Sequence, residues 1–561
     1  MARSVLTKSA IRVLCAFTLC AFGANAMGRE PATEGSPIEV RRLTEEQYRQ
    51  SIADIFGSDI EVAGRFQPEM RTEGLLAIGS AKLTIGGAGF EQYHALASNI
   101  AAQVTDAEHR DRLLSCKPSS ASGPDDVCAT TIFRQYGARL LRHPLEEERL
   151  TRFVAVANKV AVERHDFYVG ISFALTGMLS EPDFLFRVER PRPKSVRRGQ
   201  AELDGYSKAS RLSFFLWNAT PDAELLTAAG RGDLDSSRGL KKQVERMMSS
   251  PRLEAGVRAF FSDFLGFDGL QSLEKDGKIY PAFNQKTAAD AKEQTLRTIV
   301  DQLIVRKGDY RDLFTTRRTF MTRPLGRIYG VQVKSPNGWE PYEFTQDDPR
   351  AGILTHISFT ALHSHPGRSS ATLRGKALRE LLLCQKVPAP PANVNFSIVQ
   401  DSGNAEYRTA RARLTAHRSE PACAGCHKII DPMGLALETF DGDGRMRTQE
   451  NGVQIDASGE LDGVRFSDAA GLGQALRDNP AAAKCLVNSL YGYAAARKAS
   501  AADRAWMTWL EDGFSAAGYR MPDLMRQIAT SESFYRVTVV PAEEASLPPE
   551  TSSSLVKEVS K

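Results

Sequence analysis

Neither sign of charge is in large excess in this sequence, and long apolar runs are scarce. The chain holds 72 Lys and Arg residues against 68 Asp and Glu residues, a formal net charge of +4 over 561 residues. A chain this close to neutrality offers no electrostatic basis for binding nucleic acid, so we expect no nucleic-acid partner. The longest apolar run, residues 13–22, is shorter than the ~20 residues that span a bilayer. We therefore expect no membrane span in the mature chain.

The first 26 residues have the three parts of a cleaved secretory signal. Positive residues (Arg3, Lys8 and Arg12) precede the apolar run, and the small residues Ala24 and Ala26 form the cleavage site. Loss of this segment lowers the net charge from +4 to +1, because its three charged residues are all positive. We expect a protein that is secreted through the inner membrane and acts in the periplasm or outside the cell.

Cysteine is also scarce: the chain has eight, and two of them leave with the signal. Two more belong to the motif described below, which leaves Cys116, Cys128, Cys384 and Cys485. An even number of cysteines in an oxidising compartment predicts two disulfides, although buried free thiols are the alternative. Cys116 and Cys128 flank a short loop rich in Ser, Gly, Pro and Asp, which favours a local pair. Cys384 would then pair with Cys485 and tie the segment before the motif to the helices after it.

Strand signals are few and short. They are best seen in residues 451–465, where Gly, Asn and Asp turns separate short apolar stretches. Elsewhere apolar positions recur with the 3.6-residue period of amphipathic helices. One helix start is well marked, because Thr44 and Gln47 have the spacing of a capping box ahead of apolar positions. The sequence therefore predicts a mainly α fold with few short strands.

Proline-rich linkers at residues 191–194 and 388–393 divide the chain into several blocks. A last segment, rich in Ser, Glu and Pro, has the composition of a disordered tail. The predicted organisation is a signal (1–26), an N-terminal helical block (39–115), a helical block with the Cys116–Cys128 disulfide (116–192), a central helical domain (200–335), a domain with the cysteine motif (345–447), a C-terminal helical domain (460–537) and a disordered tail (541–561).

One pentapeptide carries the clearest chemistry of the chain. Residues 423–427 read Cys-Ala-Gly-Cys-His, the spacing used for covalent attachment of a c-type haem. Cys423 and Cys426 would add to the two vinyl groups of one haem, and His427 would bind the iron as the proximal ligand. We expect a single haem c and, for the domain around it, a cytochrome c-like region in the C-terminal part of the helical protein.

Three other interpretations use the same residues. A zinc site needs about four ligands, usually from two separated pairs, and the sequence has no second C-x-x-C. A thioredoxin-like redox pair needs a strand–helix context, which the helical surroundings do not offer. A structural disulfide between Cys423 and Cys426 would leave His427 without a role. Covalent haem is the interpretation that uses all three residues.

The sequence also suggests how His427 is oriented. Asp431 and Pro432 follow it closely, and a proline-containing turn there would present a backbone carbonyl to the Nδ1–H of His427. A contact of this kind fixes the ring and raises its basicity as a ligand.

The sixth iron position decides the function, and the sequence offers several candidates for it. Met521, Met446 and His365 are candidates for a sixth ligand or distal group. Each methionine has the alternative of a core side chain, and His365 that of a surface or helix-capping residue. Arg368 and Arg374 are candidates for pairing with the haem propionates, with a solvated loop arginine as the alternative.

Residues 417–441, which include the motif, resemble the haem region of a family of exported multidomain proteins. That family is known from planctomycetes, myxobacteria and proteobacteria as cytochrome-associated domains of unknown function. The other blocks that match its layout, in order, are residues 41–48, 140–145, 211–217, 350–354 with Arg374-Gly375, and 465–535. The resemblance covers most of the mature chain, and it implies haem binding and export but no particular substrate.

Two hypotheses for the function follow. The first is an exported c-type cytochrome-like protein that transfers electrons and works with a redox partner protein. The alternative is a haem-dependent oxidoreductase that acts on an extracytoplasmic substrate such as a carbohydrate or another polymer. A scaffold with a structural haem is a third possibility. The large size favours an enzyme, whereas the lack of a visible acid–base constellation favours electron transfer.

Overall fold

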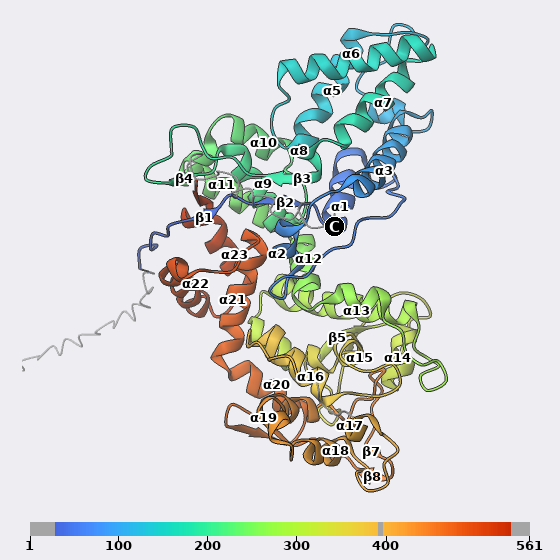
Figure 1. Ribbon diagram of the computed structural model, residues 1–561, viewed down its shortest axis with the longest axis vertical. Coiled ribbons are helices and arrows are strands. Elements are labelled where there is room, and N and C mark those ends of the chain that lie inside the picture. The colour runs from blue at the N-terminus through green and yellow to red at the C-terminus, as the bar shows by residue number, and fades with distance from the viewer. Residues whose placement is uncertain (1–27, 391–396, 540–561) are drawn as a thin grey trace, which may run out of the picture.

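The computed structural model describes residues 28–390 and 397–539. The predicted signal (1–26) and the predicted tail (541–561) lie outside these residues. The described chain is mainly helical with few short strands, as predicted (Figure 1). In its described part, no helix is both long enough and apolar enough to cross a membrane.

The upper lobe of Figure 1 is a bundle of helices from the first third of the chain. The capping box is confirmed at its first helix: Thr44 Oγ1 accepts the N–H of Gln47 at 3.2 Å, and the Gln47 side chain accepts the N–H of Thr44. The two predicted N-terminal blocks share one apolar core, in which Ile100 and Phe133 are fully buried. The elements of this lobe are β2 (Val40–Arg42), α1 (Glu45–Phe56), α3 (Gly87–Thr105), α4 (Arg110–Leu113), α5 (Asp126–Leu141), α6 (Glu147–Arg164), α7 (Phe167–Leu179), α8 (Pro182–Leu185) and β3 (Phe186–Val188).

The middle of the molecule joins segments that are far apart in the sequence. Strand β11 pairs in parallel with β1 and antiparallel with β4, so the start and the end of the described chain meet in one small sheet. A common core holds Trp217 from the central domain and Trp506 from the C-terminal domain. The elements here are β1 (Ser36–Pro37), α2 (Leu76–Gly79), β4 (Gln200–Glu202), α9 (Gly205–Trp217), α10 (Ala223–Gly230), α11 (Ser237–Met248), α12 (Leu253–Phe264), α21 (Pro480–Ala495), α22 (Arg504–Ala516), α23 (Met521–Thr530) and β11 (Arg536–Thr538).

A buried ion-pair cluster fastens the upper lobe to the middle. The carboxylate of Glu189 accepts hydrogen bonds from Arg41 at 2.6 Å and from Nε of Arg211 at 2.8 Å. Arg211 also donates to the carbonyl of Phe534, near the end of the described chain. Burial alone would raise the pKa of Glu189, but the guanidinium groups of Arg211 and Arg41 outweigh it and hold the pKa at about 2.

The lower lobe contains the predicted haem domain. Two short hairpins, β7–β8 and β9–β10, occupy the region in which the sequence predicted its strands. The elements of this lobe are α13 (Gln285–Val300), β5 (Arg318–Met321), α14 (Arg323–Tyr329), β6 (Glu340–Glu343), α15 (Ile357–Leu362), α16 (Ala371–Ala377), α17 (Ser397–Gln400), α18 (Ala410–His417), α19 (Pro421–Leu435), β7 (Gln449–Glu450), β8 (Val453–Gln454), β9 (Gly459–Leu461), β10 (Val464–Phe466) and α20 (Ala469–Asp478).

Both predicted disulfides are present. The Cα atoms of Cys116 and Cys128 lie 5.4 Å apart, and those of Cys384 and Cys485 lie 5.3 Å apart. The first closes the loop that precedes α5, and the second ties the end of the α16 segment to α21. The long-range disulfide therefore links the lower lobe to the C-terminal helices of the middle.

Candidate functional site

Two helices of the lower lobe, α16 and α19, cross at unusually short range. A Cβ on Gly375 of α16 would lie 2.0 Å from the carbonyl oxygen of Ile430, and a Cβ on Gly434 of α19 would lie 1.7 Å from that of Ala371. Only glycine permits this approach without a shift of the backbone, because no other residue lacks a Cβ. The crossing therefore fixes α19 against α16.

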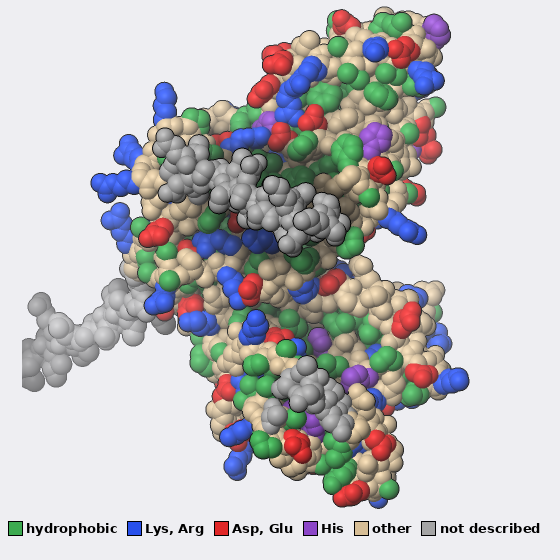
Figure 2. Space-filling model, in the orientation of Figure 1, with side chains coloured by type: hydrophobic (Ala, Val, Ile, Leu, Met, Phe, Trp, Pro, Cys, Tyr) green, Lys and Arg blue, Asp and Glu red, His purple; other side chains and the backbone are tan. Residues whose placement is uncertain are grey.

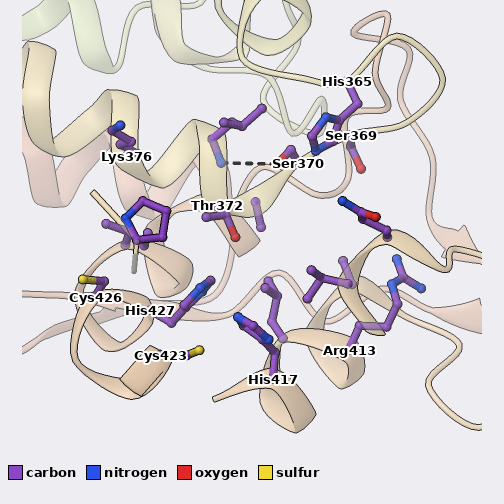
Figure 3. Close-up of a pocket in the computed structure, with 18 of the residues that line it drawn as sticks. His365, Ser369, Ser370, Thr372, Lys376, Arg413, His417, Cys423, Cys426 and His427 are labelled. Carbon is purple, nitrogen blue, oxygen red and sulfur yellow. Dashed lines mark hydrogen bonds between the residues drawn. The ribbon is translucent and has the colours of Figure 1, made fainter. Parts of the chain in front are cut away.

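A cavity lies between α16, α18, α19 and the loop of residues 365–370. In Figure 3, Cys423, Cys426 and His427 extend from α19 on one side, and His365 and Ser369 lie on the other. In the space-filling view, histidine side chains gather on the lower lobe beside apolar and basic groups (Figure 2). Much of the wall is apolar, and its apolar members are Ala371, Leu373, Val387, Pro388, Pro390, Val399, Ala410, Leu414 and Ile430.

The motif is presented to this cavity by one face of α19. The helix begins with Pro421 after Glu420 as the N-cap residue, and proline is well suited to the first turn, where its missing N–H is not needed. Cys423, Cys426 and His427 then have helical spacings of three and four residues, which place them on one face. All three line the cavity, and both cysteines are free thiols. The structure thus brings together the three predicted attachment residues.

His427 is oriented by a side chain and not by the predicted backbone carbonyl. Helix α19 continues through Pro432, so no proline turn forms there. Instead, Nδ1 of His427 lies 2.9 Å and 3.0 Å from the two carboxylate oxygens of Asp431, one helical turn further on. Asp431 is fully buried and also accepts a hydrogen bond from Thr372 of α16 at 3.2 Å. A buried carboxylate therefore holds the ring.

The three candidates for the sixth ligand lie in different parts of the structure. Met521 is fully buried in the C-terminal core at the start of α23, and Met446 is 40% exposed and forms a backbone bridge to Phe440. Neither methionine lines the cavity in the described chain. These positions correct the two methionine predictions, because long-range packing directs the side chains elsewhere. His365 does line the cavity, and burial followed by the charge of Arg368 lowers its pKa.

The two predicted propionate partners, Arg374 and Arg368, also lie in different surroundings. Arg374 is fully buried, and it donates to the carbonyls of Leu437, Phe440, Thr360 and Asp441 and to Ser364 Oγ. It joins α15, α16 and the chain after α19 and has no donor to spare for a propionate, so that prediction is corrected.

Arg368, in contrast, lines the cavity without an ion pair to a described residue. Burial, followed by the charge of Arg413, lowers its pKa. An unpaired, half-buried guanidinium of this kind is suited to an anionic group.

Four site residues were missed from the sequence. Asp431 could have been found, because it stands four residues after His427 and so on the same helical face. Arg413 and His417 have the same spacing on α18, and both line the cavity. The His417 ring lies edge-on to that of His427, with centroids 4.9 Å apart, and Arg413 is paired with Glu450. Thr372 lies on α16 and reaches Asp431 on the neighbouring helix α19, so no local pattern in the sequence marks it.

The chain is similar to five known families, each over a different part of its length. Five family models match successive parts of the chain, and each is described as a protein of unknown function: residues 41–106 (DUF1587), 128–189 (DUF1595), 203–331 (DUF1592), 350–450 (DUF1588) and 462–534 (DUF1585). The chain carries five domains of unknown function. Their presence is consistent with a multidomain family built from such domains. The cavity lies wholly within the DUF1588 domain.

No curated protein and no solved structure matches the five-domain chain. Among the residues that the structure describes, no group of three or more His, Cys, Asp or Glu side chains is gathered closely enough to hold a metal ion.

Proposed function

We propose that the protein is an exported c-type cytochrome-like protein that binds one haem covalently and transfers electrons to or from a redox partner protein. Cys423 and Cys426 would form the two thioether bonds, and His427 would be the proximal iron ligand. The observation that carries the proposal is that these three side chains line one cavity while both thiols are free.

The residues around the motif fit a haem. Leu373, Leu414 and Ile430 provide an apolar surface for the macrocycle, and Arg368 provides an unpaired positive charge for a propionate. Asp431 accepts the Nδ1–H of His427, so that Nε2 is the nitrogen left to bind iron. When bound, the haem would supply reversible one-electron chemistry in an apolar setting.

Export is supported by two features of the chain. The first 26 residues have the pattern of a cleaved signal, and four other cysteines form two disulfides. Disulfides persist in oxidising compartments, which are also where covalent haem proteins of this kind act.

A haem-dependent oxidoreductase is the second candidate. The contact between Asp431 and His427 favours it, because a carboxylate partner makes the proximal histidine a stronger electron donor than a backbone carbonyl does. No methionine of the described chain lines the cavity to take the sixth position.

Carbon monoxide binding to the reduced, haem-loaded protein separates the two candidates. A low-spin spectrum that carbon monoxide leaves unchanged supports a pure electron carrier. A prompt spectral shift without denaturant shows an accessible sixth position and supports the oxidoreductase.

A further inference from the structure

The proximal side of the cavity is arranged to donate electron density. The carboxylate of Asp431 is buried, and its hydrogen-bond donors are His427 and Thr372. A buried carboxylate accepts a stronger, charge-assisted hydrogen bond than a neutral carbonyl does, and this raises the basicity of the imidazole. Electron density pushed toward haem iron from the proximal ligand favours cleavage of an O–O bond.

The opposite side of the cavity holds the imidazole of His365, on a loop whose backbone is held by hydrogen bonds. Figure 3 shows His365 across the cavity from His427. The backbone carbonyl of His365 accepts a hydrogen bond from Lys275 Nζ at 3.1 Å. The same ammonium group donates to the backbone carbonyls of Ala361 and Ser364. Arg374 donates a hydrogen bond to the hydroxyl of Ser364 at 2.9 Å. On the other side of His365, the N–H of Asp276 donates to the carbonyl of Pro366 at 3.0 Å. The backbone is thus held on both sides of His365, and its imidazole lines the cavity, where it can exchange a proton with a bound molecule.

We propose that this cavity takes a hydroperoxide as its substrate, an inference that rests on the proposed covalent haem. The O–O bond breaks, two electrons and two protons are consumed, and ROOH becomes ROH and water. The two electrons would come singly from a reduced one-electron donor, the redox partner protein, and the haem held by Cys423, Cys426 and His427 would supply the one-electron chemistry. His365 would accept the proton of the hydroperoxide O–OH group and return it to the oxygen that leaves as ROH.

This role is compatible with electron transfer. Electrons would still enter singly from a partner, but they would end on the hydroperoxide instead of passing to a further carrier. Asp431 acts here as a positioning residue, because it touches His427 and not the substrate.

The experiment uses the full mature protein, matured with its haem, and three variants. His365→Gln removes the proton-exchanging imidazole, Asp431→Asn removes the proximal carboxylate charge, and His94→Gln changes an exposed histidine of the upper lobe as the control. Covalent haem content, the reduction midpoint potential and the rate of the spectral change on mixing with hydrogen peroxide or cumene hydroperoxide are measured for each.

The proposal predicts covalent haem in all four proteins and a fast reaction in the wild type and in His94→Gln. His365→Gln slows the reaction by about 10²- to 10⁴-fold, the usual contribution of a general acid–base group. Asp431→Asn raises the midpoint potential and also slows the reaction. A haem-loaded wild type that is inert to both peroxides, or His365→Gln and Asp431→Asn variants that react at the wild-type rate, would overturn the proposal. Failure to load haem covalently would overturn the proposed function as well, so the two failures are distinguishable.

Discussion

Gly434 of α19 faces the backbone of Ala371 in α16 so closely that a Cβ on Gly434 would lie 1.7 Å from the carbonyl oxygen of Ala371. This contact sets the separation of the two helices that form the cavity. Gly434→Ala forces them apart, and we expect it to lower the free energy of unfolding by about 1–3 kcal/mol, the usual cost of overpacking. Urea unfolding followed by circular dichroism measures the change.

Gly177→Ala in α7 is the matched control. A Cβ there would meet only Phe153, at 3.9 Å, which is ordinary van der Waals contact. Alanine is the better helix former, so this variant should be neutral or more stable by up to about 1 kcal/mol. Equal losses in the two variants would show that the crossing is not as tight as the structure places it.

The two disulfides should contribute unequally to stability. Cys384–Cys485 closes a separation of 101 residues and Cys116–Cys128 one of 12. Loop-closure entropy predicts about 4–5 kcal/mol for the long loop and about 3 kcal/mol for the short one. The paired serine variants, compared by denaturant unfolding, should follow that order. Peptide mapping without reducing agent checks the pairing itself, and free thiols at Cys384 and Cys485 would contradict it.

Glu189 should make the stability depend on pH in the acid range. Its pKa of about 2 in the folded protein lies below the ordinary value of about 4.3. The carboxylate therefore contributes stability that is complete above about pH 5 and is lost as the pH falls toward 2, on the order of 3 kcal/mol in total. Thermal unfolding between pH 2 and pH 7 measures this loss.

The variant Glu189→Gln separates this group from other carboxyl groups. It leaves Arg41 and Arg211 buried beside a neutral amide, so we expect a loss of about 3–5 kcal/mol near pH 7. Its unfolding midpoint should then vary less with pH below 5 than that of the wild type. An unchanged acid profile would show that Glu189 is not the group responsible.

Arg368 and Arg374, which the sequence could not tell apart, should respond differently to mutation. Arg374→Gln removes several buried hydrogen bonds and should destabilise the lower lobe by several kcal/mol with or without haem. Arg368→Gln should leave the fold intact, because Arg368 has no ion pair in the described chain. It should instead lower the reduction midpoint potential, since loss of a nearby positive charge favours the ferric state.

If Arg368→Gln unfolds the protein and leaves the potential of any folded fraction unchanged, the assignment of this arginine to a propionate is wrong. A redox titration of the haem-loaded variant, beside a thermal melt of the same sample, gives both results.

Local signals in the sequence were sufficient for much of the fold. The capping box at Thr44, the helical period and the turn-rich hairpin region depend on neighbouring residues, and each is present in the structure. The disulfide pairs followed from a count of cysteines and one loop. The motif residues share a face because three- and four-residue spacings do so on any helix.

Contacts between distant segments explain what the sequence could not predict. Met521 is a candidate ligand by residue type, but the packing of α23 directs it into the core. Asp431 replaced the expected carbonyl because α19 runs through Pro432 instead of turning there. Thr372 completes that contact from another helix, and no local pattern marks such a residue.

Acid–acetone extraction of the protein, matured in cells with haem c assembly, tests whether the haem is attached covalently. We expect the haem to stay with the protein and mass spectrometry to find it on the peptide containing Cys423 and Cys426. The double variant Cys423→Ser with Cys426→Ser should abolish the attachment. Extraction of all haem from the wild type, or covalent haem retained by the double variant, would contradict this assignment.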